Sequence, residues 1–445
     1  MDQNTPDFSQ AVIQSARSRI ARRLLPFLWL LYVIAFLDRA NVAYAALEMS
    51  HDLGFSDRVF GLGAGIFFLG YVLLEIPGGL IVERWSARRW ITCIMIAWGF
   101  IAVFTGFAQN AHQFYTVRFL LGAAEAGFFP GVIVYLMHWF GKKDRARAVA
   151  VFITATPISN IIGSPIAGQI MKFHVYGIAG WRWLFILEGI PAVILGIVTF
   201  FYLTDWPHEA AWLPKEECEW LTQELEREKR QKIAVRSYTV WEALRHRDVI
   251  LLALIYFMGS TGFYGFVFWF PTILKRASGL SIVKVTLLAV LPYVAALTAM
   301  LLNGWHSDKT QERRWHTSLL LFGGGTFLIL VLLSAHHIFW LQFAFFIGVA
   351  AFVHGYMPSF WALPTEFLGE SAAAASIGLI NSVGGLGGFV GPFIIGYLVT
   401  RTGTFASGLL WLVVNLFLAG ILVLFLRKPQ VQGTTLNVAY IPPLK

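Results

Sequence analysis

Long apolar stretches separated by short polar segments run along almost the whole chain of 445 residues. Each stretch approaches the roughly 20 residues that an α-helix needs to cross the hydrocarbon core of a bilayer. The first six stretches lie near residues 24–47, 58–82, 90–108, 113–138, 149–171 and 182–203. The second six lie near residues 249–274, 285–304, 316–334, 338–361, 372–399 and 405–426. The pattern predicts an all-α membrane protein with twelve transmembrane helices in two six-helix bundles.

A polar region of 45 residues divides the two sets of apolar stretches. It carries acidic and basic residues in similar numbers, and the part from Pro214 to Gln231 predicts a charged surface helix. The expected organisation is a cytoplasmic N-terminal segment (1–23), an N-terminal bundle (24–203), a cytoplasmic linker (204–248), a C-terminal bundle (249–427) and a cytoplasmic tail (428–445).

Composition agrees with a membrane protein and argues against a soluble one. Hydrophobic residues make up 57% of the chain and charged residues only 13%, about half the charged fraction of a soluble domain. The net charge of +9 could suggest a nucleic-acid partner, but the Lys and Arg residues lie in the short segments between apolar stretches. Basic residues in such places orient helices in a membrane, so we expect no nucleic-acid binding.

The distribution of basic residues predicts the orientation. With the N-terminus inside, the inner segments contain Arg17, Arg19, Arg22, Arg23, Arg84, Arg88, Arg89, Lys142, Lys143, Arg145, Arg147, Lys309, Arg313, Arg314, Arg427 and Lys428. The outer segments contain only Arg58, Lys172, Arg182, Lys275, Arg276, Lys284 and Arg401. Because positive residues concentrate on the cytoplasmic side, we expect both termini and the linker in the cytoplasm.

A short charged motif occurs twice, at the same place in each half. Gly79 is followed by Glu83, Arg84, Arg88 and Arg89, and Gly304 is followed at identical spacing by Asp308, Lys309, Arg313 and Arg314. Such a duplication indicates two homologous bundles. An acid and several basic residues in a tight turn can join neighbouring helix ends by charge-assisted hydrogen bonds. We therefore expect gating loops built by Gly79, Glu83, Arg84, Arg88, Asp308 and Arg313.

This motif, placed after the second and eighth spans, resembles that of the major facilitator superfamily. The resemblance covers nearly the whole chain. It implies two bundles around a central cavity that opens alternately to each side of the membrane.

Few charged residues lie deep inside the apolar stretches: Asp38, Arg39, Glu75, Arg118, Glu125 and Glu188. A charge at this depth costs several kcal/mol unless it is paired or hydrated, so it marks a candidate functional site. Arg118 and Glu125 are seven residues apart and share one helix face. Tyr71 and Glu75 are one turn apart in the second span. We expect the first, second and fourth spans to bring these groups to one cavity.

The segments around these charges resemble the anion:cation symporters, the branch that includes sialin, sugar-acid transporters and tartrate or phthalate permeases. The matching segments include residues 37–42, 118–131, 70–78, 180–191 and 360–364. The resemblance implies proton-coupled uptake of a carboxylate. It implies that Asp38 and Glu125 carry protons, and that Arg39, Tyr71, Arg118, Trp361 and Asn381 face the substrate, with Tyr264 as the aromatic residue from the seventh span.

The same resemblance leaves the substrate open. Phe36 stands where a tyrosine contacts sugar hydroxyls in relatives, and Pro358 and Phe360 stand where polar residues occur. A tartrate-like or sugar-acid-like carboxylate is the first expectation, and an aromatic carboxylate such as a phthalate or hydroxyphenylacetate is the alternative.

Charge balance favours coupling to protons. Two Arg and the acids Asp38 and Glu125 sum to zero, so a monoanion that enters alone leaves a net negative charge in a low-dielectric site. An accompanying proton restores neutrality. Buried Arg argues against the second candidate, a drug/proton antiporter; a sensor that does not transport is a further candidate.

Other features change this interpretation little. The sequence has no nucleophile–base pair, metal-ligand cluster or phosphate loop, so we expect neither an enzyme nor a cofactor or metal. The expected partners are the organic anion, protons and the lipid bilayer. We expect a monomer in the bacterial inner membrane.

Overall fold

The computed structural model describes residues 8–233, 246–334, 338–367 and 370–427. The secondary structure of these residues is entirely helical. Twelve segments are helical, long and apolar enough to cross a membrane. The twelve spans expected from the apolar pattern are therefore present.

The first six spans are formed by eight helices, since two spans are interrupted. These are α1 (Gln10–Asp52), α2 (Asp57–Arg84), α3 (Ala87–Thr105), α4 (Ala111–Glu125), α5 (Phe128–Trp139), α6 (Lys142–Ile153), α7 (Ala155–Ile170) and α8 (Gly180–Tyr202). Helices α4 and α5 form one span, and α6 and α7 form another. A short helix, η1 (Val175–Gly177), connects α7 to α8.

Another short helix, η2 (Pro207–Glu209), and the charged helix α9 (Lys215–Ile233) follow the sixth span. Helix α9 lies where the sequence predicts a surface helix. The remaining helices are α11 (Arg247–Ser278), α12 (Ile282–Leu288), α13 (Val290–Thr310), α14 (Arg314–Leu333), α15 (Phe339–Gly355), α16 (Met357–Phe367), α17 (Glu370–Thr402) and α18 (Ala406–Leu424). Pairs α12–α13 and α15–α16 each form one span.

Capping side chains set several helix starts. Ser9, Ser56, Ser86 and Asn110 each precede a helix, and each side chain accepts a hydrogen bond from the backbone N–H three residues later. These bonds satisfy amide groups that have no partner within the helix. Helix α1 begins well before the apolar stretch. The basic residues before the first span therefore belong to α1 itself.

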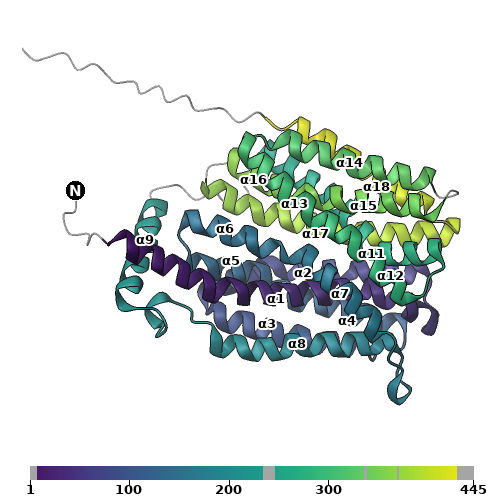
Figure 1. Cartoon of the computed structure of the whole chain (residues 1–445), viewed down its shortest axis with the longest axis horizontal. Helices are drawn as coiled ribbons and strands as arrows, with labels where there is room; N and C mark the ends of the chain where they lie inside the picture. Colours follow the sequence, from purple (N-terminus) through teal and green to yellow (C-terminus); the bar gives the residue numbers. More distant parts are fainter. Residues whose placement is uncertain (1–7, 234–245, 335–337, 368–369, 428–445) are drawn as a thin grey trace, which may run out of the picture.

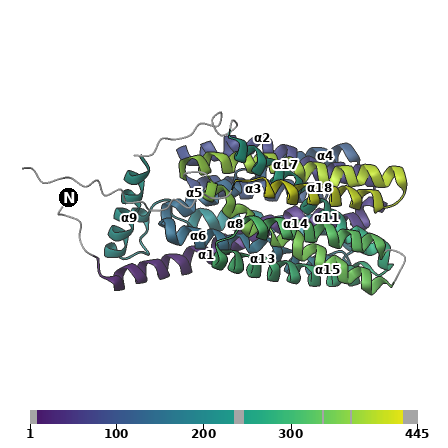
Figure 2. The ribbon, with the colours of Figure 1, turned by 90° about the horizontal axis from the view of Figure 1, so that it is seen from above.

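The spans run along the long axis of the molecule, with α1–α8 on one side and α11–α18 on the other (Figure 1). Helix α9 lies beyond the spans, beside the start of α1, and Figure 2 shows the same arrangement from above. Both ends of the described chain lie at this end of the molecule, which we call the α9 end. The other end, where α2 begins and α11 finishes, is the opposite end.

The two bundles approach most closely along α2 and α17. A Cβ atom added to Gly61 would lie 2.5 Å from the carbonyl oxygen of Pro392, and one added to Gly65 would lie 2.7 Å from that of Phe389. Glycine at these positions lets the two backbones touch. The bundles are therefore joined by direct backbone packing from the opposite end toward the middle of the molecule.

Polar contacts reinforce this junction at the opposite end. The guanidinium group of Arg276 pairs with both carboxylate oxygens of Asp57, at 2.5 and 3.2 Å. The backbone N–H of Arg58 donates to Thr400 Oγ1 at 2.9 Å. These bonds connect the start of α2 to the ends of α11 and α17, so this end of the molecule is closed between the bundles.

Candidate functional site

The centre of the site is an ion pair between α1 and α4. Arg39 Nη2 donates to Glu125 Oε1, and the two residues are 9% and 2% exposed. The other terminal nitrogen, Nη1, lies 3.4 Å from the hydroxyl oxygen of Tyr264, to which it donates. Since Tyr264 belongs to α11, Arg39 connects the two bundles through one guanidinium group.

Aromatic rings surround the Arg39 guanidinium. Its carbon lies 5.6 Å from the ring centre of Phe36, 5.3 Å from Phe67 and 5.2 Å from Tyr71. A cation at such distances is stabilised by the ring faces, more strongly where water is excluded. The rings hold the guanidinium in the middle of the molecule, so Arg39 does not extend to either end.

Arg118 lies beside the same ring and is fully buried. Its guanidinium carbon is 5.0 Å from the ring centre of Phe67, so both arginines contact one phenylalanine. Its Nε donates to the carbonyl oxygen of Gly63 at 3.4 Å. Its terminal nitrogens, Nη1 and Nη2, have no hydrogen-bond partner among the described residues. A buried guanidinium with two free donors can form a bidentate pair with an anionic group.

Asp38 faces a different part of the bundle. Its carboxylate accepts a hydrogen bond from Trp98 Nε1 of α3 at 2.9 Å, and the residue is 2% exposed. Successive residues of a helix point about 100° apart, so Asp38 and its neighbour Arg39 face different helices. The structure therefore brings Arg39, Tyr71, Arg118 and Glu125 together as expected but turns Asp38 toward α3.

A second group of polar residues joins α2 to α17. Asn381 Nδ2 donates to Glu75 Oε1, and Ser382 Oγ donates to Glu75 Oε2 at 3.1 Å. Glu75 is 6% exposed and lies one turn nearer the α9 end than Tyr71. The sequence identified Glu75 and Asn381 separately. Sequence reasoning missed Ser382 and this cross-bundle contact, because the partners are more than 300 positions apart.

Trp361 belongs to an aromatic cluster on the α9 side of the ion pair. Its ring centre lies 4.9 Å from that of Tyr256 and 5.4 Å from that of Phe360. Tyr256 precedes Tyr264 by eight residues of α11, about 12 Å along the helix. Trp361 therefore lies at the level of the Glu75 group, between the α9 end and the two arginines.

His354 is a packing residue in this structure. The side chain is fully buried, its Nδ1 lies 2.9 Å from the carbonyl oxygen of Ala350, and its ring packs against those of Phe263 and Tyr293. No group of His, Cys, Asp and Glu side chains among the described residues has an arrangement that could hold a metal ion.

The duplicated motif lies at the α9 end in both halves. In the second copy, Arg313 Nη2 lies 2.6 Å from Asp308 Oδ1, and Arg313 Nη1 donates to Ser307 Oγ at 2.9 Å. In the first copy, the Arg88 side chain lies 3.7 Å from Asp205, which also accepts a hydrogen bond from the Arg88 backbone. The side chains of Glu83 and Arg84, and the surroundings of Gly79, lie outside the described set.

Glu312 organises the turn of the second copy. Its carboxylate accepts hydrogen bonds from the backbone N–H groups of Trp315 and His316, at the start of α14. His316 Nδ1 lies 2.9 Å from the same carboxylate. Partial burial by itself raises the pKa of Glu312, but these hydrogen bonds outweigh it and lower the pKa below its ordinary value.

The fold and the paired charges define a class, the polytopic membrane transporters, and the comparisons with known proteins identify the family. The sequence profile of the Major Facilitator Superfamily matches residues 28–392. The chain belongs to this superfamily, whose members are transporters and not enzymes.

Relatives of known name are similar over nearly their whole length. A protein of Agrobacterium vitis named "Putative tartrate transporter" is 45% identical over 95% of this chain and 93% of its own length. The "Quinolone resistance transporter" of Acinetobacter baumannii is 36% identical over 97% of this chain and 99% of its own length. The "Inner membrane transport protein RhmT" of Escherichia coli (strain K12) is 35% identical over 96% and 99%.

Solved structures share the fold at low sequence identity. The xylose transporter XylE from E. coli, in a partially occluded inward-open conformation, gives a TM-score of 0.75 at 15% identity, covering 94% of this chain and all of that one. A bacterial homologue of the human lysosomal transporter Spinster, in an inward-facing and occupied conformation, gives 0.72 at 16% identity, covering 94% and 97%. At these identities the likeness concerns the fold alone.

Proposed function

We propose that the protein is a proton-coupled symporter that imports a small organic carboxylate by alternating access. The observation that supports this most is Arg118, a fully buried guanidinium whose two terminal nitrogens have no protein partner. A substrate carboxylate can accept both hydrogen bonds in a bidentate pair. Such a pair would supply the negative charge that the buried Arg lacks.

The neighbouring ion pair provides the coupling. In the empty carrier Glu125 neutralises Arg39. When a proton binds to Glu125, the carboxylate loses its charge and Arg39 is free to hold a second part of the substrate. Because a net charge in the low-dielectric centre is costly, the carrier changes conformation readily only when it is fully loaded or empty. We assign Asp38 a supporting proton-binding role, because its buried carboxylate interacts electrostatically with Glu125 and Arg118.

The polar group on α2 and α17 suits a hydroxylated substrate. Asn381 and Ser382 donate to Glu75, which leaves the second N–H and the amide oxygen of Asn381 for a substrate hydroxyl, and Trp361 and Tyr71 offer ring faces. With the name of the A. vitis relatives, this makes a tartrate-like or sugar-acid-like carboxylate our first choice. The aromatic surroundings of Arg39 keep an aromatic carboxylate as the alternative.

The closed opposite end indicates the conformation. If the α9 end is cytoplasmic, as the distribution of basic residues predicts, closure of the opposite end excludes an outward-open carrier and supports an inward-facing one. We propose that the motif loops with Glu83, Arg84, Arg88, Asp308 and Arg313 hold the α9 end together when the carrier opens outward. We further propose a bacterial inner-membrane location, cytoplasmic termini and a monomeric carrier.

Uptake by proteoliposomes tests the proposal. Accumulation of radiolabelled tartrate should rise when an inward proton gradient is imposed. Uptake that does not depend on the gradient would refute proton coupling. The Glu125→Gln variant should still exchange substrate across the membrane but lose gradient-driven accumulation. Glu219→Gln, on the surface of α9, is the control and should behave like the wild type. A Glu125→Gln variant that still accumulates tartrate would remove Glu125 from the mechanism.

Export of a drug is the second candidate, because one relative is named for quinolone resistance. The two candidates predict opposite ligand charge preferences at the buried arginines. Isothermal titration of the purified protein with tartrate, phthalate and a lipophilic cation separates them. Binding of the cation but of neither carboxylate would favour drug export.

A further inference from the structure

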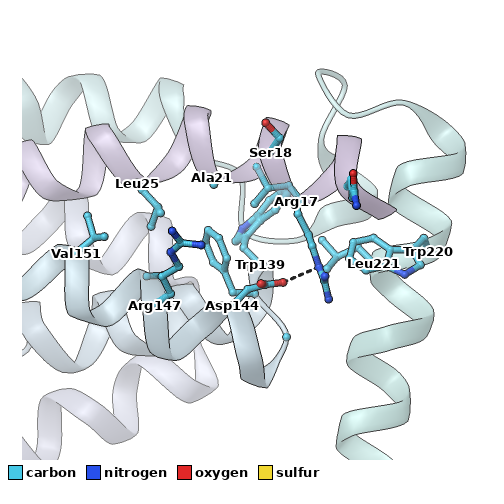
Figure 3. A pocket seen from close by; sticks show the side chains of 15 residues that line it. Arg17, Ser18, Ala21, Leu25, Trp139, Asp144, Arg147, Val151, Trp220 and Leu221 are labelled. Carbon is cyan, nitrogen blue, oxygen red and sulfur yellow. Dashed lines mark ion pairs between the residues drawn. The ribbon is translucent and has the colours of Figure 1, made fainter. Parts of the chain in front are cut away.

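A hollow of about 440 Å³ lies at the α9 end, away from the two buried arginines. It is lined by the first part of α1, by the end of α5 and the following helix α6, and by the first half of α9 (Figure 3). Helix α9 is fixed against α1, because Ser15 Oγ and Arg19 Nε both donate to the carboxylate of Glu217, at 2.7 and 3.1 Å. Hydrogen bonds between α1 and α9 therefore fix two walls of this hollow, which we call the α1–α6–α9 hollow.

The charge in this hollow is positive. Arg17 Nε pairs with Asp144 Oδ2 at 2.8 Å, but both side chains are more than a third exposed, so the pair is weak. Arg147, on the same side of α6, is exposed and has no hydrogen-bond or ion-pair partner among the described residues. One carboxylate thus faces two guanidinium groups, which leaves one positive charge without a counterion.

The wall of the hollow on the side of the spans is apolar. Leu25 of α1 and Val151 of α6 line it (Figure 3), and Val151 is 42% exposed. Val151 lies one turn from Arg147, and Leu25 lies about 12 Å along α1 from Arg17. The headgroup layer of a bilayer is about 5–7 Å thick on each side. The separation of Arg147 and Val151, about 6 Å along α6, matches this thickness, and Leu25 lies deeper, at the level of the acyl chains.

We propose that the α1–α6–α9 hollow binds the headgroup of an acidic phospholipid from the leaflet at the α9 end. The phosphate pairs with Arg147 and with the terminal nitrogens of Arg17, whose Nε is held by Asp144, and an acyl chain follows Leu25 and Val151 toward the bilayer core. A free anion would use the two guanidinium groups but would gain nothing from the apolar wall. A zwitterionic lipid would pack against the apolar wall but would not neutralise the positive charge that has no counterion.

This site is separate from the proposed transport site, and its occupation does not depend on the transported substrate. A bound lipid would connect the first span, the fifth span and the linker helix through one phosphate group. We therefore expect an acidic lipid to stabilise the attachment of α9 to the N-terminal bundle.

Native mass spectrometry of the full chain in detergent tests the site. Phosphatidylglycerol should bind more tightly than phosphatidylcholine with the same acyl chains. Arg147→Gln should weaken the binding of phosphatidylglycerol about fivefold, and the double variant with Arg17→Gln about 25-fold, since each basic residue near a membrane surface contributes about one such factor. Arg22→Gln is the matched control, because Arg22 is an exposed residue of α1 that does not line the hollow.

Three results would overturn the proposal. Equal affinity for the two lipids would show that charge is not recognised. An equal loss in Arg22→Gln and Arg147→Gln would show general attraction to the basic surface. Displacement of phosphatidylglycerol by millimolar sodium phosphate would show that the hollow takes a free anion. Because Arg147 has no partner to lose, its variant should melt at the wild-type temperature without lipid, which separates lost binding from lost folding.

Discussion

At the scale of single residues, Arg118 is the main support for the proposed anionic substrate. A buried charge without hydrogen-bond partners is strongly unfavourable, and the terminal nitrogens of Arg118 have none among the described residues. The Phe67 ring partly stabilises the Arg118 cation. The same ring also contacts Arg39, and one ring cannot neutralise two cations. Glu125 and Asp38 both interact electrostatically with Arg118 and together balance the two arginines, so an anionic substrate at Arg118 would need an accompanying proton.

Replacement of Arg118 by lysine should weaken substrate binding although the charge is kept. An ammonium group cannot form the bidentate pair, and the loss of one hydrogen bond to a charged group costs about 2 kcal/mol, or about a 30-fold rise in Kd. Tartrate titration by calorimetry measures this change. Arg89→Lys, an exposed change on α3, should bind like the wild type. Unchanged affinity of Arg118→Lys would show that Arg118 does not contact the carboxylate.

Helical periodicity predicted which charged side chains share a face, but not their partners. The spacing of Arg118 and Glu125 predicts that they share one face of the fourth span, as two helical turns separate them. The partner of Asp38, Trp98, lies in an apolar stretch that offers no polar signal. The contact of Arg39 with Tyr264 spans 225 positions, so it depends on how the bundles pack.

At the scale of elements, the start of α14 depends on Glu312. Its carboxylate caps the helix by accepting backbone N–H groups, and a negative charge at a helix N-terminus is favourable. The lowered pKa of Glu312 means that the folded state binds its proton less tightly than the unfolded state. The cap therefore stabilises the protein above the unfolded pKa of about 4.3, and this stability is lost as the pH falls through the folded pKa.

Melting of Glu312→Gln as a function of pH measures this contribution. The variant should melt below the wild type at pH 6–7, and the difference should shrink as the pH falls below about 4. Glu219→Gln, which changes an exposed acid of α9, should show no such trend. A difference between wild type and Glu312→Gln that stays constant with pH would mean that the charge of Glu312 is not what stabilises the turn.

The close approach of α2 and α17 is a second element-scale feature. Gly61→Val should stop transport, because its Cβ would meet the carbonyl oxygen of Pro392 and keep the opposite end from closing. Gly378→Val, on the partner helix α17, is the control, since a Cβ there meets no atom within 4 Å. Uptake of tartrate by proteoliposomes compares the two variants. Transport by Gly61→Val at the wild-type rate would show that this approach is dispensable.

At the scale of the whole molecule, the twelve spans and the position of α9 followed from hydropathy, because a bilayer requires long apolar helices. Hydropathy did not predict that four of the spans are interrupted. Helix α4 stops at Glu125 and α5 begins at Phe128, at small residues where the sequence shows only an apolar run. Tertiary packing decides such breaks, so periodicity within one stretch cannot locate them.

The orientation of the molecule is the last property that the sequence predicts, and cysteine labelling can measure it. In a chain with both native cysteines replaced by serine, Arg227→Cys would present a thiol on α9, where the native side chain is 71% exposed. Arg401→Cys would present one at the exposed end of α17. Because basic residues concentrate at the α9 end, a membrane-impermeant maleimide should label Arg227→Cys only in inside-out vesicles and Arg401→Cys only in right-side-out vesicles. The reverse pattern would turn the closed end toward the cytoplasm and would make the structure an outward-facing one.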